Sequence, residues 1–369
     1  MTEWIECTLD KLGEIVGGAT PSTKCEDYYG GSIPWITPKD LSSFKGRYIT
    51  SGERNITEKG LASCSAQMMP KDAVLFTSRA PIGYVAIASQ SVCTNQGFKS
   101  IVVNEKADPL FVCYLLKYNK DAIEAMGSGT TFKEVSGKTM RAVKVRIPLD
   151  VSYQKRIAAV LDSLDTKIEN NERINDNLQQ QAQAIYSSMF IDNPDPAWSH
   201  GHLSDLITVK YGKDHKKLAD GIYPVYGSGG IMRYVERPLY NKESVLIPRK
   251  GTLNNVMYVN QPFWSVDTMF YTEMKLPNVA KFVYHFVKAK DLASMNAGSA
   301  VPSMTTDILN AMEVVIPSAS ALEEFESLVA PMYEAMEAND VQSKALSQMR
   351  DTLLPKLMSG EIDVSDIQL

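Results

Sequence analysis

The second half of this chain repeats the first half. The segment Asp72–Phe98 recurs in outline at Glu243–Phe270, and Gly129–Pro148 matches Gly298–Pro317 in layout. The copies lie about 170 residues apart, far beyond the period of roughly 20–50 residues that marks a solenoid repeat. The pattern therefore indicates a duplicated domain with pseudo-two-fold internal symmetry, and two globules that share one scaffold but differ in their loops.

Composition is that of a soluble globular protein of two or three domains. Of the 369 residues, 44% are hydrophobic and 22% are charged, and no apolar run reaches the length of a membrane span. The N-terminus lacks an apolar signal core, so we expect a cytoplasmic protein. All five cysteines fall in the first copy without CxxC spacing, which favours reduced thiols: Cys7, Cys25, Cys64, Cys93 and Cys113.

Charge is distributed unevenly along the chain. The overall net charge is −5, but residues 1–150 carry +2, 151–195 carry −3, 196–317 carry +3 and 318–369 carry −7. The globules are thus mildly basic, and the segments that follow them are acidic. Acidic helices are also common as solvated surfaces, so charge alone leaves open whether these segments bind a partner.

Two long helices are predicted, one after each globule, at Tyr153–Phe190 and Glu323–Met358. Both carry apolar residues at alternating spacings of three and four, which is the seam of a coiled coil. Each helix should be about 55 Å long and act as a stiff spacer. Pro355 should kink or end the second helix.

Polar residues interrupt both seams near their middle. In an antiparallel pair, Asn175 would face Asn339 and Asn171 would face Ser343. A buried polar layer of this kind fixes the register of a coiled coil at some cost in stability.

Each globule is predicted to be rich in short strands, with one amphipathic helix per copy at Pro109–Asn119 and Val279–Val287. Together with the long helices this gives an α+β fold. The predicted strands are rich in β-branched and aromatic residues: Ala73–Thr77, Tyr84–Ala88, Ser100–Val103, Val143–Ile147, Ser244–Ile247, Asn255–Val259, Met269–Met274 and Glu313–Ile316.

The sequence contains no complete motif for catalysis, cofactor binding or metal binding. Neither an [Asn/Asp]-Pro-Pro-aromatic string nor a GxGxxG after a strand occurs. The segment Ser136–Thr139 resembles the end of a phosphate-binding loop, but Phe132 stands where its first glycine is needed. The pair His200 and His202 lacks further ligands at a metal-binding spacing, and the glycine cluster Gly227–Gly230 is either a phosphate cradle or a tight turn. We expect no cofactor and no metal.

In the order in which they occur, several segments resemble the specificity subunit of type I restriction-modification systems over essentially the full chain. These segments are Leu9–Gly18, Ile33–Ile36, Thr77–Gly83, Asn95–Phe98, Gln154–Ala158, Tyr226–Ile231, Leu246–Thr252, Phe263–Thr268 and Leu353–Ile362.

The resemblance implies a DNA-binding subunit without catalytic activity. Residues 1–150 and 196–317 would be two target recognition domains, each reading one half of a bipartite, asymmetric double-stranded DNA target. Residues 151–195 and 318–369 would be the central and C-terminal conserved spacer helices, which set the gap and dock two methyltransferase subunits. Restriction and translocase subunits would join the full complex, and the partners would supply the adenine-N6 methylation and the ATP-dependent endonuclease activity.

The candidate DNA contacts are polar or basic residues in the variable loops, whose side chains suit base edges or phosphates. Arg79 and Arg249 stand out because each follows an equivalent strand. The full set is Thr77, Ser78, Arg79, Asn95, Gln96, Thr130, Thr131 and Lys133 in the first copy, and Tyr226, Ser228, Arg249, Lys250, Asn254, Asn255, Ser299 and Ser303 in the second.

Two other classes of function stay open from the residues alone. One is a protein scaffold with duplicated interaction domains that does not read DNA. The other is a self-sufficient nuclease or methyltransferase, which the missing motifs disfavour. Basic, variable loops favour DNA reading over both.

Overall fold

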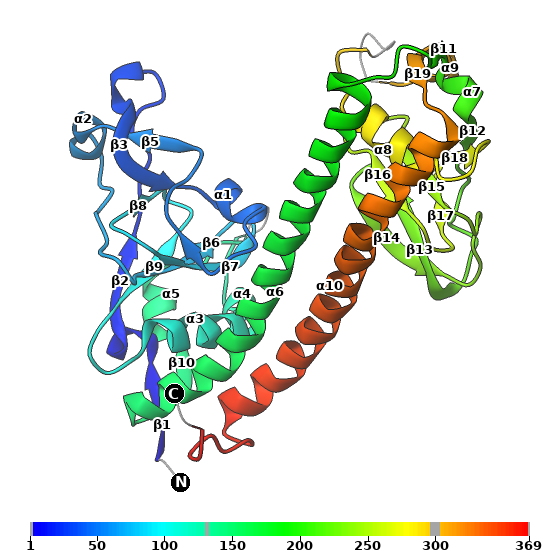
Figure 1. Ribbon diagram of the computed structural model, residues 1–369. Helices are drawn as coiled ribbons and strands as arrows, with labels where there is room; N and C mark the ends of the chain where they lie inside the picture. The colour runs from blue at the N-terminus through cyan, green and yellow to red at the C-terminus, as the bar shows by residue number, and fades with distance from the viewer. Residues whose placement is uncertain (1–2, 130–132, 296–302, 368–369) are drawn as a thin grey trace. The chain divides into compact units, whose positions relative to one another are not determined.

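The computed structural model describes residues 3–129, 133–295 and 303–367 (Figure 1). The chain divides into two compact units, residues 1–171 with 340–369 (unit 1) and residues 172–339 (unit 2). Each unit combines one strand-rich globule with one end of both long helices. The predicted α+β class is confirmed.

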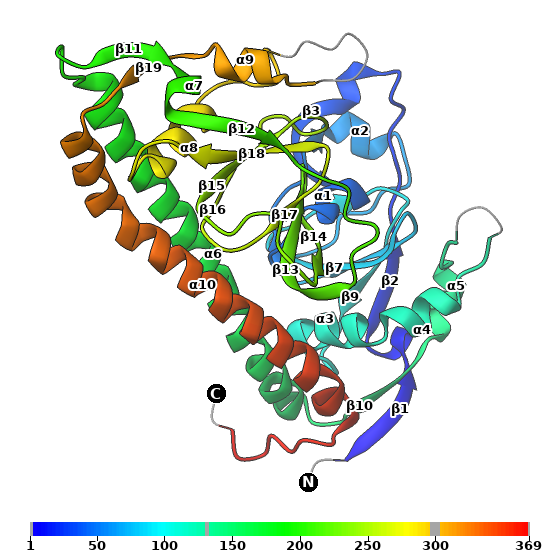
Figure 2. The same cartoon turned by 90° about the vertical axis from the view of Figure 1, so that its right-hand side faces the viewer.

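Unit 1 contains three sheets, with strand orders β2-β9-β6-β7-β4, β5-β3-β8 and β1-β10. The two-stranded β1-β10 pair is visible in Figure 2. Its strands are β1 (Trp4–Thr8), β2 (Gly13–Gly17), β3 (Tyr29–Ile36), β4 (Tyr48–Ile49), β5 (Arg54–Ile56), β6 (Val74–Ser78), β7 (Ile82–Ala88), β8 (Cys93–Thr94), β9 (Lys99–Val103) and β10 (Lys144–Pro148). Its shorter helices are α1 (Pro38–Ser42), α2 (Glu58–Ala62), α3 (Pro109–Tyr118), α4 (Lys120–Ala125) and α5 (Gly137–Ala142).

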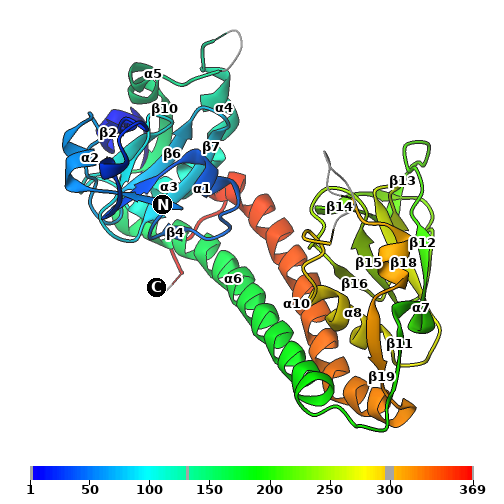
Figure 3. The ribbon, with the colours of Figure 1, turned by 90° about the horizontal axis from the view of Figure 1, so that it is seen from above.

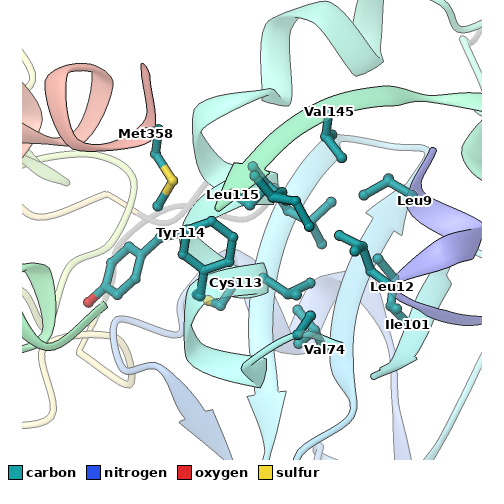
Figure 4. Close-up of a cluster of buried hydrophobic side chains, with 14 of the residues drawn as sticks. Leu9, Leu12, Val74, Ile101, Cys113, Tyr114, Leu115, Val145 and Met358 are labelled. Carbon is teal, nitrogen blue, oxygen red and sulfur yellow. The ribbon is translucent and has the colours of Figure 1, made fainter. Parts of the chain in front are cut away.

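The largest core of unit 1 lies where α3 covers the central sheet (Figure 4). Val74 and Ile101 of the sheet meet Leu115 of α3, and all three are buried. Ile157 and Leu161 of the first long helix belong to the same core. Burying such side chains contributes roughly 1.5–3 kcal/mol each, so the helix end is part of the globule and not an appendage.

Unit 2 repeats this plan with strand orders β12-β18-β15-β16, β14-β13-β17 and β11-β19. Helix α8 packs against β15 and β16 (Figure 3). The strands are β11 (Ser199–His202), β12 (Ile207–Tyr211), β13 (Asp220–Gly227), β14 (Gly230–Val235), β15 (Ser244–Pro248), β16 (Met257–Val259), β17 (Trp264–Ser265), β18 (Met269–Met274) and β19 (Glu313–Ile316). The shorter helices are α7 (Leu203–Leu206), α8 (Ala280–Lys288) and α9 (Thr306–Asn310).

Strand pairing makes the two globules topological equivalents. The parallel contact of β3 with β8 corresponds to that of β13 with β17, and β2-β9-β6-β7 corresponds to β12-β18-β15-β16. One connection differs. Between β3 and β5, unit 1 inserts residues 37–53, which contain α1 and add β4 to the sheet edge beside β7. Unit 2 joins β13 to β14 through Ser228 and Gly229.

The long helices are α6 (Val151–Ser187), which ends in a π-helical turn at Ser188–Asp192, and α10 (Ala319–Ser359). Pro355 does not end the second helix, because α10 continues to Ser359 and also contains Pro331; that Pro355 kinks the helix stays a prediction. Each proline removes one N–H from the helix ladder. The carbonyls that lose this partner belong to Asp351 and Ser327, both exposed to water, so the cost is small.

Within each unit the ends of α6 and α10 run antiparallel. In unit 2, the Asn339 side chain donates to Asn175 Oδ1 at 2.8 Å. In unit 1, Asn171 Nδ2 donates to Ser343 Oγ at 3.1 Å and to Gln342 Oε1 at 2.9 Å. Rising residue numbers in α6 thus meet falling numbers in α10. That this polar layer fixes the register stays a prediction.

A buried ionic chain joins the first globule to both helices in unit 1. The Tyr114 hydroxyl of α3 donates to Asp165 Oδ2 in α6 at 2.8 Å, and Arg350 of α10 donates to Asp165 Oδ1 at 2.8 Å. Burial acts to raise the pKa of Asp165. The hydrogen bonds from Arg350 and Tyr114 and the charge of Lys117 outweigh it and hold that pKa below its ordinary value.

In unit 2, a network of neutral side chains joins the globule to both long helices. His285 of α8 is fully buried; its Nδ1 donates to Gln183 Oε1 of α6 at 2.8 Å, and its Nε2 accepts from the Tyr333 hydroxyl of α10 at 3.0 Å. Burial, helped by the nearby charge of Lys288, lowers the pKa of His285 to about 4.

We expect Asp165→Asn to destabilise the protein by about 1–3 kcal/mol, because it leaves buried partners without their charged acceptor. Asp351→Asn is the matched control: Asp351 pairs with the same Arg350 guanidinium at 2.8 Å but is 66% exposed, so its loss should cost less than about 1 kcal/mol. Urea unfolding measures both. Because the pKa of Asp165 is lower in the folded state than in the unfolded state, its ionised carboxylate stabilises the fold at neutral pH. The loss of stability caused by Asp165→Asn should therefore shrink as pH falls below about 4. Equal effects of the two substitutions would contradict the buried network.

The stability of the wild type should fall between pH 6.5 and 4 on account of His285. Over that interval the unfolded state binds a proton that the folded state excludes, which costs on the order of 3 kcal/mol by pH 4. Denaturation at several pH values should show this slope reduced in His285→Gln and retained in His200→Gln, since His200 is exposed. An identical slope in all three proteins would contradict the assignment.

Candidate nucleic-acid interface

The variable loops of each globule meet at one end of its main sheet, which we call the loop edge. In unit 1, Gly17 at the end of β2 pairs with Lys99 at the start of β9, and Ser78 at the end of β6 pairs with Ile82. The loops that follow β2 and β6 and precede β9 therefore lie together. In unit 2, the pairs Tyr211 with Phe270 and Pro248 with Met269 create the same edge.

A glycine and an indole fix the first loop of each edge. A Cβ on Gly18 would lie 2.1 Å from the Thr94 carbonyl oxygen, so only glycine fits there. The Trp35 indole then donates to the Ala19 carbonyl at 3.0 Å. In unit 2, a Cβ on Gly212 would lie 2.0 Å from the Val266 carbonyl oxygen. The Trp264 indole donates to the Lys213 carbonyl at 2.8 Å.

Two of the predicted contacts in unit 1 lie inside the protein. Thr77 and Ser78 are fully buried in β6. The Thr77 hydroxyl accepts from the Tyr84 N–H at 2.8 Å, and the Ser78 hydroxyl donates to the Gly97 carbonyl at 3.1 Å. Their side chains are inaccessible to DNA and instead hold the loop that begins at Arg79.

The other described candidates of unit 1 reach the loop edge. Asn95 is half-buried and accepts from the Gly97 N–H at 2.8 Å, which shapes a turn. Gln96 is exposed and accepts a hydrogen bond from Thr20 of the first loop. Lys133 is exposed, while Thr130 and Thr131 lie outside the described residues.

Arg79 belongs to a small charged cluster. Its guanidinium lies 3.5 Å from one carboxylate oxygen of Glu134, and Lys99 Nζ lies 3.6 Å from the other. Arg79 is 35% exposed and Glu134 is 42% exposed. A carboxylate between two cations can accept a hydrogen bond from a base while the cations face phosphates.

In unit 2, Arg249 and Lys250 follow β15 directly. The Arg249 guanidinium lies 5.3 Å from the centre of the Tyr211 ring and donates to the Asp267 carbonyl at 3.3 Å. Lys250 is exposed, and Ser303 pairs with its backbone. One cation is thus held on an aromatic ring while the next points to solvent.

The remaining candidates of unit 2 have mixed environments. Tyr226 is buried. Asn255 donates to the Ser228 carbonyl at 2.8 Å, so it supports the β13–β14 turn. Asn254 is exposed and donates to Asp291 at 3.0 Å, which holds the pKa of that carboxyl below its ordinary value. Ser299 lies outside the described residues.

Hydrogen bonding aligns the basic residues of the two loop edges. Ser78 N–H donates to the Gly97 carbonyl and Arg249 N–H donates to the Thr268 carbonyl, so Ser78 is the equivalent of Arg249. Arg79 pairs with Glu134 as Lys250 pairs with Ser303. Arg79 and Arg249 do each follow an equivalent strand, as expected, and the basic position that the two copies share residue for residue is Arg79 with Lys250.

Sequence reasoning missed several cations at these edges. Lys213, Lys216 and Lys217 are exposed in the loop after β12. In unit 1, exposed Arg141 of α5 lies near Lys99, since a Cβ on Gly137 would approach both side chains. The dense lysines between 213 and 217 were a usable signal, whereas the position of Arg141 depends on the fold.

The alternative motifs have structural roles. Ser136 caps α5 by accepting from the Thr139 N–H at 3.0 Å. Gly227 and Gly230 flank the hairpin turn of β13 and β14. Among the described residues, no group of His, Cys, Asp and Glu side chains is placed to hold a metal ion. Within the same residues, no helix combines the length and apolarity that a membrane crossing needs.

The chain is similar to known proteins over most of its length. The type I restriction modification DNA specificity domain matches residues 1–180 and 197–325. The MjaIX specificity subunit of Methanocaldococcus jannaschii, a type I restriction enzyme component, is 32% identical over 411 residues, covering 99% of this chain and 95% of its own. The EcoprrI specificity subunit of Escherichia coli is 23% identical over 364 residues, with 90% and 89% covered.

A solved structure shares the fold. The crystal structure of the type I restriction-modification S subunit from M. genitalium matches with a TM-score of 0.63 at 18% identity and covers 97% of this chain and 96% of that one. With its domain duplicated and matched over most of its length, the chain belongs to the type I restriction-modification DNA specificity family.

Proposed function

We propose that each loop edge reads one half of a bipartite, asymmetric double-stranded DNA target. The observation that carries this proposal is the repetition of one basic edge in both units, with Arg79 and Lys250 at equivalent positions beside further exposed cations. Cations at loop tips supply phosphate binding, and the neighbouring polar groups supply base contacts.

The two edges differ in the chemistry around the shared basic position. Arg79 forms a backbone bridge and an ion pair with Glu134, whereas Lys250 forms a backbone bridge with Ser303. A carboxylate accepts hydrogen bonds from cytosine or adenine amino groups, while a hydroxyl can donate or accept. Different edges on the same scaffold would give two different half-sites, hence an asymmetric target.

The helix pair would set the gap between the half-sites and dock the partner subunits. The MjaIX relative is a specificity subunit of a restriction enzyme. By analogy, this chain would be non-catalytic and would bind two methyltransferase subunits through the acidic helix surfaces, with restriction and translocase subunits in the full complex. Adenine-N6 methylation and ATP-dependent cleavage would belong to those partners, in the cytoplasm.

Methylation mapping tests the proposal. The chain is co-expressed with its methyltransferase subunit in a host without adenine methylation, and N6-methyladenine is located across the genome. One split motif with two short defined halves and a fixed gap is expected. Replacing residues 196–317 by those of a relative should change only one half. A stable complex that methylates no motif would favour the protein scaffold instead.

We expect Lys250→Ala to weaken DNA binding of the methyltransferase complex and to lower the slope of log K against log salt by about 0.9, the value for one phosphate contact. Lys242→Ala is the matched control. Lys242 precedes β15 at the opposite end of the strand and is exposed, as Lys250 is, so its substitution should leave the slope unchanged. Fluorescence anisotropy at several salt concentrations measures the slopes.

Arg79→Ala should have the same effect in unit 1, and Lys71→Ala, at the opposite end of β6, should have none. If the two control lysines changed the slope as much as Lys250 and Arg79, the loop edges would not be the DNA-facing surfaces.

A further inference from the structure

The insertion 37–53 of unit 1 places one buried cation against the long helix α6. Arg47 is 6% exposed, although it lies between α1 and the edge strand β4. Its backbone carbonyl accepts from the Ile87 N–H of β7 at 2.7 Å, which ties the insertion to the main sheet. Its guanidinium points the other way, to α6.

Three residues on one face of α6, about one helical turn apart from each other, contact this guanidinium. NH1 lies 2.8 Å from both the carbonyl oxygen and the Oδ1 of Asp162. NH2 donates to Thr166 Oγ1 at 2.9 Å and to Glu169 Oε2 at 3.1 Å. These residues are spaced by four and then three, so the contact runs along about 10 Å of the helix. Charge-assisted bonds in a planar fork are directional as well as strong.

The first globule is therefore attached to α6 by apolar packing, by the hydrogen bond from Tyr114 to Asp165 and by the guanidinium of Arg47. The apolar attachment consists of Ile157, Ala158 and Leu161, which lie in the globule's core. Apolar packing is strong but non-directional, and by itself it allows small rotations. Arg47 supplies a directional attachment one to two turns further along the helix, and its guanidinium reaches three residues of α6 where Tyr114 reaches one. This fork and the Tyr114 hydrogen bond together restrict an angle that apolar packing alone leaves adjustable.

This device belongs to the insertion and not to the shared scaffold. In unit 2, where Ser228 and Gly229 replace the insertion, a buried cation of another origin binds the other helix. Lys281 of α8 donates to Glu326 of α10 at 2.6 Å and to Glu243 at 3.1 Å. The attachment through Arg47 is thus an addition to unit 1.

We propose that Arg47 is a positioning residue that fixes the angle between the first globule and α6, and thereby the number of base pairs between the two half-sites. The inference rests on the proposed function, since it presumes that the first loop edge reads DNA. One added base pair moves the half-site by about 3.4 Å and also rotates it by about a tenth of a turn. Only a globule that can pivot follows both changes.

The test is methylation mapping of the complex with Arg47→Gln, which removes the charge and the fork and leaves a shorter, neutral polar side chain. We expect both half-site sequences to be unchanged. Methylation at targets whose gap is one base pair longer or shorter should rise about tenfold relative to the wild type, on the scale of one or two charge-assisted hydrogen bonds. Lys39→Gln is the control, because it breaks an exposed ion pair with Glu53 in the same insertion.

A second variant protects the test against poor folding. Thr166→Val with Glu169→Gln removes the hydroxyl acceptor and the negative charge of the other acceptor on α6, and leaves Arg47 paired with Asp162. It should broaden the accepted gaps in the same direction but less. Thermal unfolding of each complex separates a change in gap from a loss of stability.

The outcomes distinguish this inference from the proposed function. A wild-type complex without a split motif would overturn the proposed function itself. A split motif whose single gap is kept by both variants would overturn the role of Arg47 alone. Uniform loss of methylation at every gap length, in complexes that still assemble, would also overturn it, because that result indicates general structural support.

Discussion

In each unit, a buried polar side chain on the helix that covers the sheet begins a hydrogen-bonded network that reaches both long helices. Tyr114 of α3 meets Asp165 and, through it, Arg350; His285 of the corresponding helix α8 meets Gln183 and Tyr333. A buried polar group without a partner costs about 1–3 kcal/mol, so packings of the globule that break these contacts are disfavoured. Apolar packing holds the globule on the helices, and this polar contact selects which of the similar packings is adopted.

The two networks differ in chemistry, although the globules share one topology. The first is charged, and the hydrogen bonds to Asp165 keep that carboxylate ionised. The second is neutral, because burial keeps a proton off His285. The charged network and the neutral network respond differently to acid. Replacing the side chains of one network by those of the other, one at a time, would leave a buried polar group unpaired.

The duplication made much of the fold predictable. Strands such as β6 and β15 and helices such as α3 and α8 are apolar runs that occur twice, and their expected positions match the structure within a few residues. The smaller sheet of β3, β5 and β8 was not expected, since its strands are short and interrupted by glycine and proline. Helix α10 tolerates Pro355 because water can serve the carbonyl that loses its partner, which a residue-level rule does not anticipate.

The candidate interface was less predictable than the fold. The loops could be located from their composition, but burial decides which side chains in them are available. Thr77 and Ser78 look suitable by residue type and yet lie inside the sheet. Hydrogen-bond register, and not residue type, shows that Arg79 is the equivalent of Lys250.

The attachment through Arg47 has a consequence for how such genes can recombine. A crossover near residue 150 would transfer the first globule with its insertion but leave Asp162, Thr166 and Glu169 behind on the recipient's helix. The incoming arginine would then meet whatever side chains the recipient carries there. Recombinants that keep a well-defined target should therefore have their junction beyond residue 169, so that the inherited segment is longer than the globule itself.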